Sequence, residues 1–282
     1  QDGNNFYVSC ERVFNARLRN VPVIVSSNND GCSVARSQEA KALGVRMGQP
    51  VHELKHLVKH HGLQVLSANF ALYGDISHRI AEIIRAEVPR LEIYSIDEVF
   101  YDLTGIRERV ALASSLREKV LRWTGIPSCI GIGPTKTLSK LANKVAKSGA
   151  GVVDLAEPEA RARCLEVFPI ADVWGVGPSY AARLTTMGIH TAAHLRDAPS
   201  DLILRDFGVV LSRTQRELQG HPCIELQDIE PDRQQIVVSR SFGQRVTDHG
   251  AVGQALASFA VRAAEKLRKR GLVAAGVGFF VH

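Results

Sequence analysis

The alternation of apolar and polar positions predicts a chain in which helices and short strands are mixed throughout. Short β-branched or aromatic runs bounded by turn residues indicate buried strands, whereas apolar residues that repeat every three or four positions indicate one buried face of a helix. The runs typical of strands lie at 23–25, 91–101, 129–133, 235–241 and from 273 onward. The periodic stretches that predict helices lie at 10–18, 37–44, 69–84, 107–123, 136–147, 154–168 and 255–270. In the helix at 69–84, the periodicity turns Phe70, Tyr73 and Ile76 inward.

The run at 91–102 carries two adjacent carboxylates, Asp97 and Glu98, among β-branched and aromatic residues. Neighbouring anions in an apolar strand repel each other and lose hydration, so they need a compensating cation or a set of hydrogen-bond donors. A divalent metal ion would meet that need. The alternative is a turn in which both carboxylates are solvated. Because successive strand residues point to opposite faces, either the strand begins here or one carboxylate does not reach the ion directly.

The stretch at 134–147 follows a glycine-containing run and shows two stripes at helical spacing. Leu138, Leu141, Ala142 and Val145 form the apolar stripe. Lys136, Lys140, Lys144 and Lys147 form the other, and no acid within the stretch neutralises them. A helix N-terminus adds partial positive charge, so the stretch predicts an anion site, although its spacing is not that of a Walker loop.

Gly175 and Gly177 lie between two short predicted helices in an order typical of the helix-hairpin-helix. Glycines there allow backbone N–H groups to approach a nucleic acid phosphate, and no base is read. The alternative is an ordinary glycine-containing turn. Residues 227–233 predict a linker. Residues 234–282, which include Arg240 and Arg245, hold seven Lys or Arg against two acids, a net charge of +5 that predicts a separate module gripping a phosphate backbone.

The overall charge of +6, with a pI near 9.2, favours a polyanionic partner such as nucleic acid, although many basic proteins bind none. The five cysteines are scattered and lack zinc-ligand spacing, so we expect neither disulfides nor a zinc site, and reduced thiols in the cytoplasm. We expect no signal peptide and no membrane span, because no apolar run approaches the roughly 20 residues that a span needs. The chain opens at Gln1 and stops within an apolar run, so we expect a fragment.

Four segments, in matching order and spacing, resemble the translesion Y-family DNA polymerases and, within that family, the UmuC type. They are Asp2 with residues 5–7 and 9–11; residues 27–32 with 35–36 and 39–44; residues 94–98; and residues 135–138. The resemblance extends over essentially the whole chain and implies an α+β right-hand polymerase. The implied domains are a palm (1–5 and 69–147), fingers (6–68), a helical thumb with the helix-hairpin-helix (148–226), the linker (227–233) and a truncated little finger (234–282).

The resemblance also implies a reaction, the template-directed addition of deoxynucleotides to a primer with two divalent ions, which we expect to be Mg²⁺. Asp2 and Asp97 would bridge both ions, and Glu98 would bind the ion that activates the primer 3′-hydroxyl. The carbonyl of Gly3, where the family usually has a larger residue, would contact the ion on the nucleotide side. By its position alone, Asp2 would instead be a helix N-cap.

The same resemblance assigns the nucleotide contacts. Tyr7 would be the steric gate that excludes a ribose 2′-hydroxyl, although Phe6 and Tyr7 would both be core residues in the alternative interpretation. Lys41 and Lys136 would contact the triphosphate, and Lys41 would do so without the bidentate fork of arginine. Lys140, Lys144 and Lys147 would be either a solvated face or DNA-backbone contacts.

The implied partners are primer–template DNA, a deoxynucleoside triphosphate, a processed UmuD-type dimer and a RecA-type filament in the SOS response to DNA damage, with low fidelity and lesion bypass. Two alternatives remain open. One is a catalytically silent DNA-binding protein of the same fold. The other is a nucleotidyl cyclase, which has a similar palm and paired carboxylates; the helix-hairpin-helix pattern and the basic C-terminal block argue against it.

Overall fold

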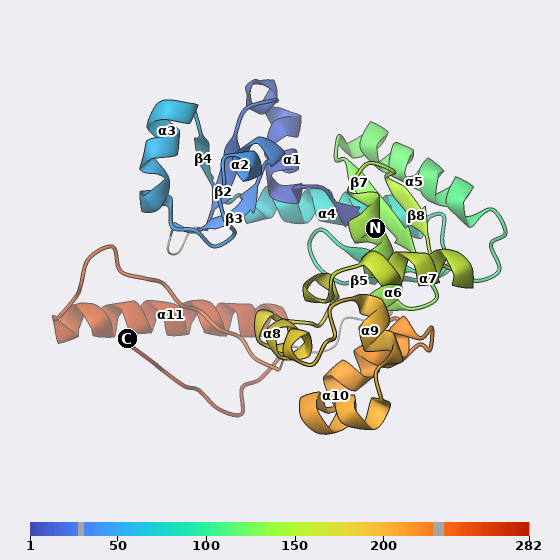
Figure 1. The fold of residues 1–282 in the computed structure, drawn as a ribbon. Helices are drawn as coiled ribbons and strands as arrows, with labels where there is room; N and C mark the ends of the chain where they lie inside the picture. The colour runs from blue at the N-terminus through green and yellow to red at the C-terminus, as the bar shows by residue number, and fades with distance from the viewer. Residues whose placement is uncertain (28–30, 228–233, 282) are drawn as a thin grey trace. The chain divides into compact units, whose positions relative to one another are not determined.

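The structure is a computed structural model that describes residues 1–27, 31–227 and 234–281, and the chain forms two compact units. Unit 1 comprises Gln1–Arg19 and Asn69–Ile229, and unit 2 comprises Asn20–Ala68 and Glu230–His282 (Figure 1). Among the helices of the described residues, none combines the length and the apolar character needed to cross a membrane.

Unit 1 is built on two small sheets. In the first, β1 (Asp2–Gly3) pairs antiparallel with β7 (Ser128–Ile132), and β7 pairs parallel with β8 (Val152–Asp154). The second is the hairpin of β5 (Leu91–Ile93) and β6 (Val99–Tyr101), which confirms a hairpin at 91–101 but places Asp97 in the connection between the strands and not inside a strand. The first residue joins the two sheets, because Gln1 and Val99 exchange backbone hydrogen bonds of 2.9 and 3.0 Å. The N-terminal residues are therefore part of the framework.

Strand β7 has a different neighbour on each face. Ile130 and Ile132 belong to a core cluster with α4 (Phe70–Arg85) and α5 (Arg109–Thr124). Between them, Gly131 faces α6 (Lys136–Ala146), and a Cβ built on Gly131 would lie 2.1 Å from backbone atoms of Asn143 and Ser139. Since adjacent strand residues point to opposite faces, α6 lies across the sheet from α4 and α5 (Figure 1). Glycine at 131 is what permits this close approach.

Helix α1 (Phe6–Phe14) packs against α4 and begins after Asn5, which has a left-handed backbone. Asp2 lies in β1, so it does not cap this helix. Tyr73 and Ile76 of α4 are buried as expected, but the expectation for Phe70 is wrong, since this side chain is 51% exposed. Phe70 is the first residue of α4, directly after the capping Asn69, and the buried face begins one turn later.

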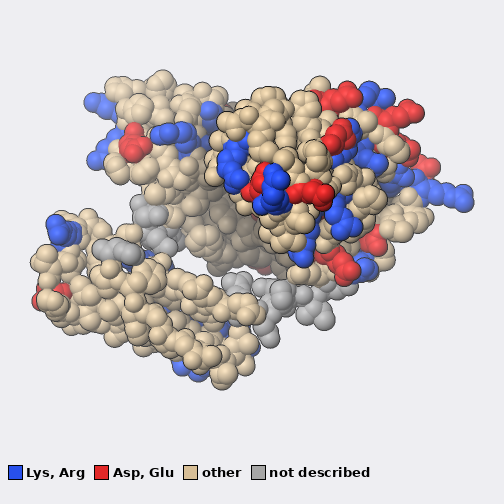
Figure 2. Space-filling view, turned by 60° about the horizontal axis from the view of Figure 1, so that its bottom comes forward, with Lys and Arg blue, Asp and Glu red and all other residues tan. Residues whose placement is uncertain are grey.

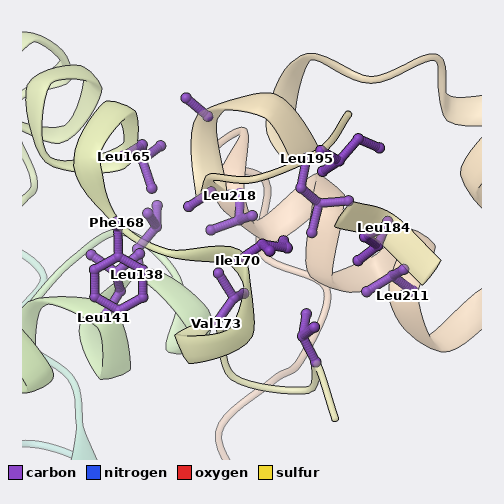
Figure 3. Packing of buried hydrophobic residues seen from close by; sticks show 14 of the residues in the cluster. Leu138, Leu141, Leu165, Phe168, Ile170, Val173, Leu184, Leu195, Leu211 and Leu218 are labelled. Atoms are coloured by element: carbon purple, nitrogen blue, oxygen red, sulfur yellow. The ribbon is translucent and has the colours of Figure 1, made fainter. Parts of the chain in front are cut away.

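The C-terminal part of unit 1 is helical and shares a large apolar cluster with α6 (Figure 3). Leu138 and Leu141 of α6 lie in one cluster with Leu165, Phe168 and Leu218. The helix expected at 154–168 begins only at Pro158, because Val152–Asp154 pairs with β7. The helices here are α7 (Pro158–Val167), the 3-10 helix η3 (Ile170–Asp172), α8 (Pro178–Thr186), α9 (Ala192–Asp197) and α10 (Ser200–Leu218), which kinks at Gly208.

Unit 2 contains a sheet in which β2 (Val23–Ser26) lies between β3 (Ser33–Arg36) and β4 (Gln64–Ser67). Its small core joins Ile24 to Leu54, Leu57 and Leu63. The other elements are η1 (Ala16–Leu18, in unit 1), α2 (Gln38–Ala42), η2 (Val51–Leu54), α3 (Lys55–His61) and α11 (His249–Lys269).

The strands expected at 235–241 and from 273 onward are wrong for the residues described, which form no strand there. An apolar run becomes a strand only where a neighbouring strand accepts and donates its backbone hydrogen bonds, and neither run pairs with a strand of the described residues. Val273, Val277, Phe279 and Phe280 are accordingly exposed.

Candidate active site

The predicted metal ligands Asp2 and Glu98 face each other although they are distant in sequence. They form an isolated antiparallel β-bridge, and the backbone N–H of Gly3 donates to the carbonyl of Asp97 at 2.8 Å. Directly opposed residues of an antiparallel pair project their side chains on the same face. The pairing of the N-terminal strand therefore brings the carboxylates of Asp2 and Glu98 together.

Two lysines of the α6 region neutralise this pair. The Nζ of Lys147 lies 2.7 Å from Oδ2 of Asp2, and the Nζ of Lys140 donates to both carboxylate oxygens of Glu98, at 2.9 and 2.8 Å. Burial raises the pKa of Asp2 to about 6, although Lys147 opposes the shift. Burial opposes ionisation of Glu98 as well, but the hydrogen bonds and charge of Lys140 outweigh it, so the pKa of Glu98 is lowered. The site is thus a partly buried carboxylate pair matched by two ammonium groups.

The third carboxylate, Asp97, is oriented differently. Its Oδ1 accepts a hydrogen bond of 2.7 Å from the Ser95 hydroxyl. Its charge reaches Tyr7, whose pKa is raised first by burial and then by Asp97. Among the residues described, no group of three or more His, Cys, Asp and Glu side chains is arranged to hold a metal ion. Asp97 thus adjoins Glu98 in sequence, and its side chain is hydrogen-bonded to Ser95.

Gly3 suits its place because space there is limited. A Cβ at this position would lie 2.9 Å from Cδ2 of the Phe6 ring, and Phe6 is 3% exposed within the core. A larger residue would force that ring to move. The sheet position leaves the backbone of Gly3 beside Asp2 and bonded to Asp97.

Tyr7 lies on an aromatic platform. Its ring stacks on Tyr73 with centroids 4.3 Å apart and planes at 13°, and it meets Phe70 edge-on at 6.0 Å. Tyr73 is fully buried, and its hydroxyl donates to Oε1 of Glu11 at 2.6 Å. Of the aromatic pair at 6 and 7, only Phe6 is a core residue, whereas Tyr7 is half-buried.

Lys136 lines the same cavity as Asp2 and Glu98 but lies in a buried ion pair with another acid. Its Nζ bonds to Glu92, and the two side chains are 7% and 8% exposed. Lys136 also donates to the carbonyl of Glu225 at 2.8 Å, and Glu92 accepts from the backbone N–H of Gln227 at 2.8 Å. These bonds fix the segment that follows α10 to the β5 strand.

The expectation of four unneutralised lysines is therefore wrong, because each pairs with an acid outside the stretch. Lys136 pairs with Glu92, Lys140 with Glu98, Lys144 with Asp172 and Lys147 with Asp2. Sequence reasoning missed the contact of Lys140 and Lys147 with the carboxylates. The signal was their spacing of seven residues, which places both on one helical face.

A cavity of about 1170 Å³ opens beside these groups. Asp2, Glu98, Lys140, Lys147 and Trp174 are among its lining residues, all of them in unit 1. On the face of unit 1 seen at the right of Figure 2, basic and acidic side chains lie beside one another. A surface of mixed charge favours a ligand whose charged groups each meet an opposite charge over a ligand attracted by one broad region of a single sign.

The other predicted site residues lie apart from the carboxylates or in unit 2. Gly175, with φ of 88°, and Gly177, which precedes α8, form the turn between η3 and α8. Lys41 is exposed on α2. Arg240 and Arg245 precede α11 and are exposed. The roles expected of these five residues remain predictions.

Comparison with known proteins gives two family-model matches, the impB/mucB/samB family over residues 1–144 and the C-terminal domain of the same family over residues 233–282. The chain is 48% identical over 276 residues to Protein ImpB of Salmonella typhimurium and 47% identical over 274 residues to Protein UmuC of Salmonella typhimurium strain LT2. Each alignment covers 95% of this chain and 65% of the relative, so the chain spans about two thirds of the length of these relatives. It is 32% identical to DNA polymerase IV of Moorella thermoacetica, covering 87% of this chain and 61% of that protein.

Solved structures with a similar fold include a Y-family DNA polymerase chimera of Dbh and Dpo4, with a TM-score of 0.77 and 21% identity over 94% of this chain and 78% of that one. Another is DinB from Sulfolobus solfataricus, with a TM-score of 0.69 and 22% identity over 77% of this chain and 64% of that one. These likenesses confirm the α+β fold of the Y-family polymerases.

Proposed function

Because this chain belongs to the impB/mucB/samB family, we propose that it is the catalytic part of a translesion DNA polymerase, which extends a primer opposite damaged template. The observation that supports this most directly is the pairing of β1 with β7 and with residues 98–99. It brings Asp2 against Glu98, with Asp97 adjacent. A nucleotidyl transfer site needs acidic ligands from distant segments, and the approach of Asp2 to Glu98 supports such a site.

The donor set fits divalent metal ions. Asp2, Asp97, Glu98 and the Gly3 carbonyl offer only oxygen ligands, which Mg²⁺ prefers. Asp2 and Glu98 are partly buried and each is neutralised by one ammonium group, so a divalent ion that displaces those groups would meet two anionic ligands. Bound Mg²⁺ would stabilise charge on the attacking and leaving oxygens of an in-line displacement.

The remaining residues bind and orient the substrates. Lys147 pairs with Asp2 and its side chain is 41% exposed, so we assign it to the phosphate side of the site in preference to Lys136, whose ammonium lies in a buried pair with Glu92. The half-buried Tyr7 ring, supported from below by Tyr73, provides a flat surface for the sugar, where a 2′-hydroxyl would collide.

Duplex DNA would lie along the turn of Gly175 and Gly177 and along the basic C-terminal segment that includes Arg240 and Arg245. The contacts are to phosphates, so they do not depend on base sequence. From the family resemblance the proposal extends to a processed UmuD-type dimer and a RecA-type filament as partners, and to work in the cytoplasm.

Primer extension with Mg²⁺ tests the proposal. Asp97→Asn and Glu98→Gln should each lower incorporation at least about a hundredfold, because each removes charge that a preorganised site needs. Asp172→Asn is the matched control, since this acid lines the same cavity but pairs with Lys144. Equal incorporation by wild type and Asp97→Asn would refute the metal assignment. Duplex binding without incorporation would indicate a silent DNA-binding protein, and product formed without a template would indicate a cyclase.

A second experiment tests the sugar gate. Tyr7→Ala should raise ribonucleotide incorporation relative to deoxynucleotide incorporation by up to about a hundredfold, the range that a hydrophobic surface achieves against one added hydroxyl. Phe70→Ala is the control, because this ring touches Tyr7 only edge-on. An unchanged ratio would remove Tyr7 from the role of gate.

A further inference from the structure

Lys140 has a second set of partners besides Glu98. Its Nζ lies 4.7 Å from the centre of the Tyr94 ring and 5.1 Å from that of the Trp174 ring. Both distances are within the range in which an ammonium group is attracted to a ring face. The side chain of Lys140 is only 19% exposed, so this attraction acts in a largely desolvated place.

The aromatic rings hold one another in position without the lysine. Tyr94 and Trp174 meet edge to face at 5.8 Å, and Phe100 lies 5.4 Å from Tyr94 and 6.3 Å from Trp174. Tyr94 belongs to the loop that ends in Asp97 and Glu98, whereas Trp174 directly precedes the glycine turn at 175–177. Two segments distant in sequence thus form a preorganised cage around one ammonium group.

Divalent ions and Lys140 compete for the same oxygens. Both carboxylate oxygens of Glu98 accept hydrogen bonds from Lys140, so turning this carboxylate fully toward a metal ion breaks at least one of those bonds. Releasing a partly buried ammonium group to no partner is costly. The cage removes much of that cost, because the rings keep their contact with Nζ after the carboxylate has left.

Resting on the proposed function, we propose that Lys140 is a positioning residue: it occupies Glu98 in the metal-free protein, and the Tyr94–Trp174 cage retains its ammonium when a divalent ion takes the carboxylate. Lys140 keeps the site neutral and Glu98 in place until the ion arrives. Trp174 sets how easily the exchange occurs, and so links the glycine turn to metal affinity.

Binding of Mn²⁺ alone to the whole chain, followed by electron paramagnetic resonance of the free ion, tests this inference. Lys140→Met should tighten Mn²⁺ binding roughly tenfold, since it removes both a competitor and a positive charge. Trp174→Leu should weaken Mn²⁺ binding about threefold, since Lys140 then depends on Glu98 alone. Trp174→Phe, which keeps a ring, should restore most of the affinity.

The double variant Lys140→Met with Trp174→Leu separates the cage from damage to the fold. It should bind Mn²⁺ as tightly as Lys140→Met, because the ring acts only through the lysine. Lys144→Met is the charge control, since it loses the same charge one turn further along α6, where Lys144 pairs with Asp172. Equal tightening by Lys144→Met and Lys140→Met would overturn the inference, and so would weaker binding by the double variant than by Lys140→Met.

Fluorescence gives an independent measure, because the chain has two tryptophans and Trp123→Phe leaves Trp174 as the sole indole. Mg²⁺, which does not quench an indole, should change the emission of this variant, and Lys140→Met in the same background should abolish the change; a persistent change would contradict the cage. Primer extension on the same samples distinguishes the two proposals. If the wild type is active but Lys140→Met binds Mn²⁺ no more tightly than the wild type, only this inference is overturned. If the wild type has neither activity nor Mn²⁺ binding, the proposed function is overturned too.

Discussion

Helices α6 and α11 are both basic and amphipathic in sequence, yet they use their charges in different ways. In α6, seven of eleven residues are buried, and all the lysines of the α6 region bond to acids from other segments. In α11, none of the 21 residues is buried, and within the described part of the chain Lys266, Arg268 and Lys269 have no ion pair. A basic stripe can thus be an internal fastening, in which each lysine pairs with an acid of another segment, or an external surface, and the stripe itself does not reveal which.

The largest effect is expected at the buried end of α6. Lys136→Met should lower the free energy of unfolding by about 3–5 kcal/mol, because it leaves the Glu92 carboxylate buried without its cation. Chemical denaturation measures the loss. Adding Glu92→Leu should recover much of it, since an apolar pair of similar volume avoids the uncompensated charge.

The same variant examines the phosphate role that the resemblance assigns to Lys136. A lysine held mainly for nucleotide binding would give a variant with unchanged unfolding and a raised KM for the deoxynucleotide. That outcome would contradict the view of Lys136 as an internal fastening.

The difference between the two helices also shows what could be predicted from the sequence. The helix at 136–147 was predictable because its apolar spacing is a local property, and the structure confirms it as α6. The acid partners at 2, 92, 98 and 172 were not, because nothing within the stretch specifies which distant segment will lie opposite. The strands expected at 235–241 and from 273 failed for a related reason, since a strand depends on a neighbour that its own sequence does not contain.

The candidate site likewise has a part that could be predicted from the local sequence and a part that could not. The adjacent carboxylates at 97 and 98 stood out locally, because charge inside an apolar run demands compensation. Their convergence with Asp2 required the pairing of β1, two residues long, which no periodicity can reveal. The cage of Tyr94 and Trp174 around Lys140 joins three segments and was likewise invisible in the sequence.

A smaller loss of stability is expected where Glu217 accepts hydrogen bonds at the N-terminus of α6. The fully buried Glu217 accepts from the backbone N–H and hydroxyl of Thr137 and from the backbone N–H groups of Cys223 and Ile224. Each carboxylate oxygen accepts from two of these donors, so Glu217→Gln turns an amide donor toward two of them and should lower the free energy of unfolding by about 2 kcal/mol. Thermal unfolding measures it, with the exposed Glu157→Gln as control. A cost equal to that of the control would show that α6 does not depend on this cap.

On α11 the expected effect concerns binding and not folding. Replacing Lys266, Arg268 and Lys269 together with Gln should leave the unfolding transition unchanged. It should weaken duplex binding about tenfold at low salt, and flatten the salt dependence by about one logarithmic unit for each phosphate that the variant no longer neutralises. Arg79, Arg85 and Arg205, all exposed and paired with acids, give a control triple to Gln with the same loss of charge. Equal weakening of duplex binding by both triple variants would show that α11 contributes only its net charge.

The smallest effect is expected at Lys144, which separates burial from helix position within α6 itself. Its pair with Asp172 has side chains 49% and 40% exposed, whereas those of Lys136 and Glu92 are 7% and 8% exposed. Water screens an exposed pair, so Lys144→Met should lower the free energy of unfolding by less than about 0.5 kcal/mol. Denaturation of Lys144→Met beside Lys136→Met measures the ratio of the two costs. Similar costs at both positions would mean that the lysines of α6 act through the charge of the helix as a whole. The distinction between an internal fastening and an external surface would then not hold for α6.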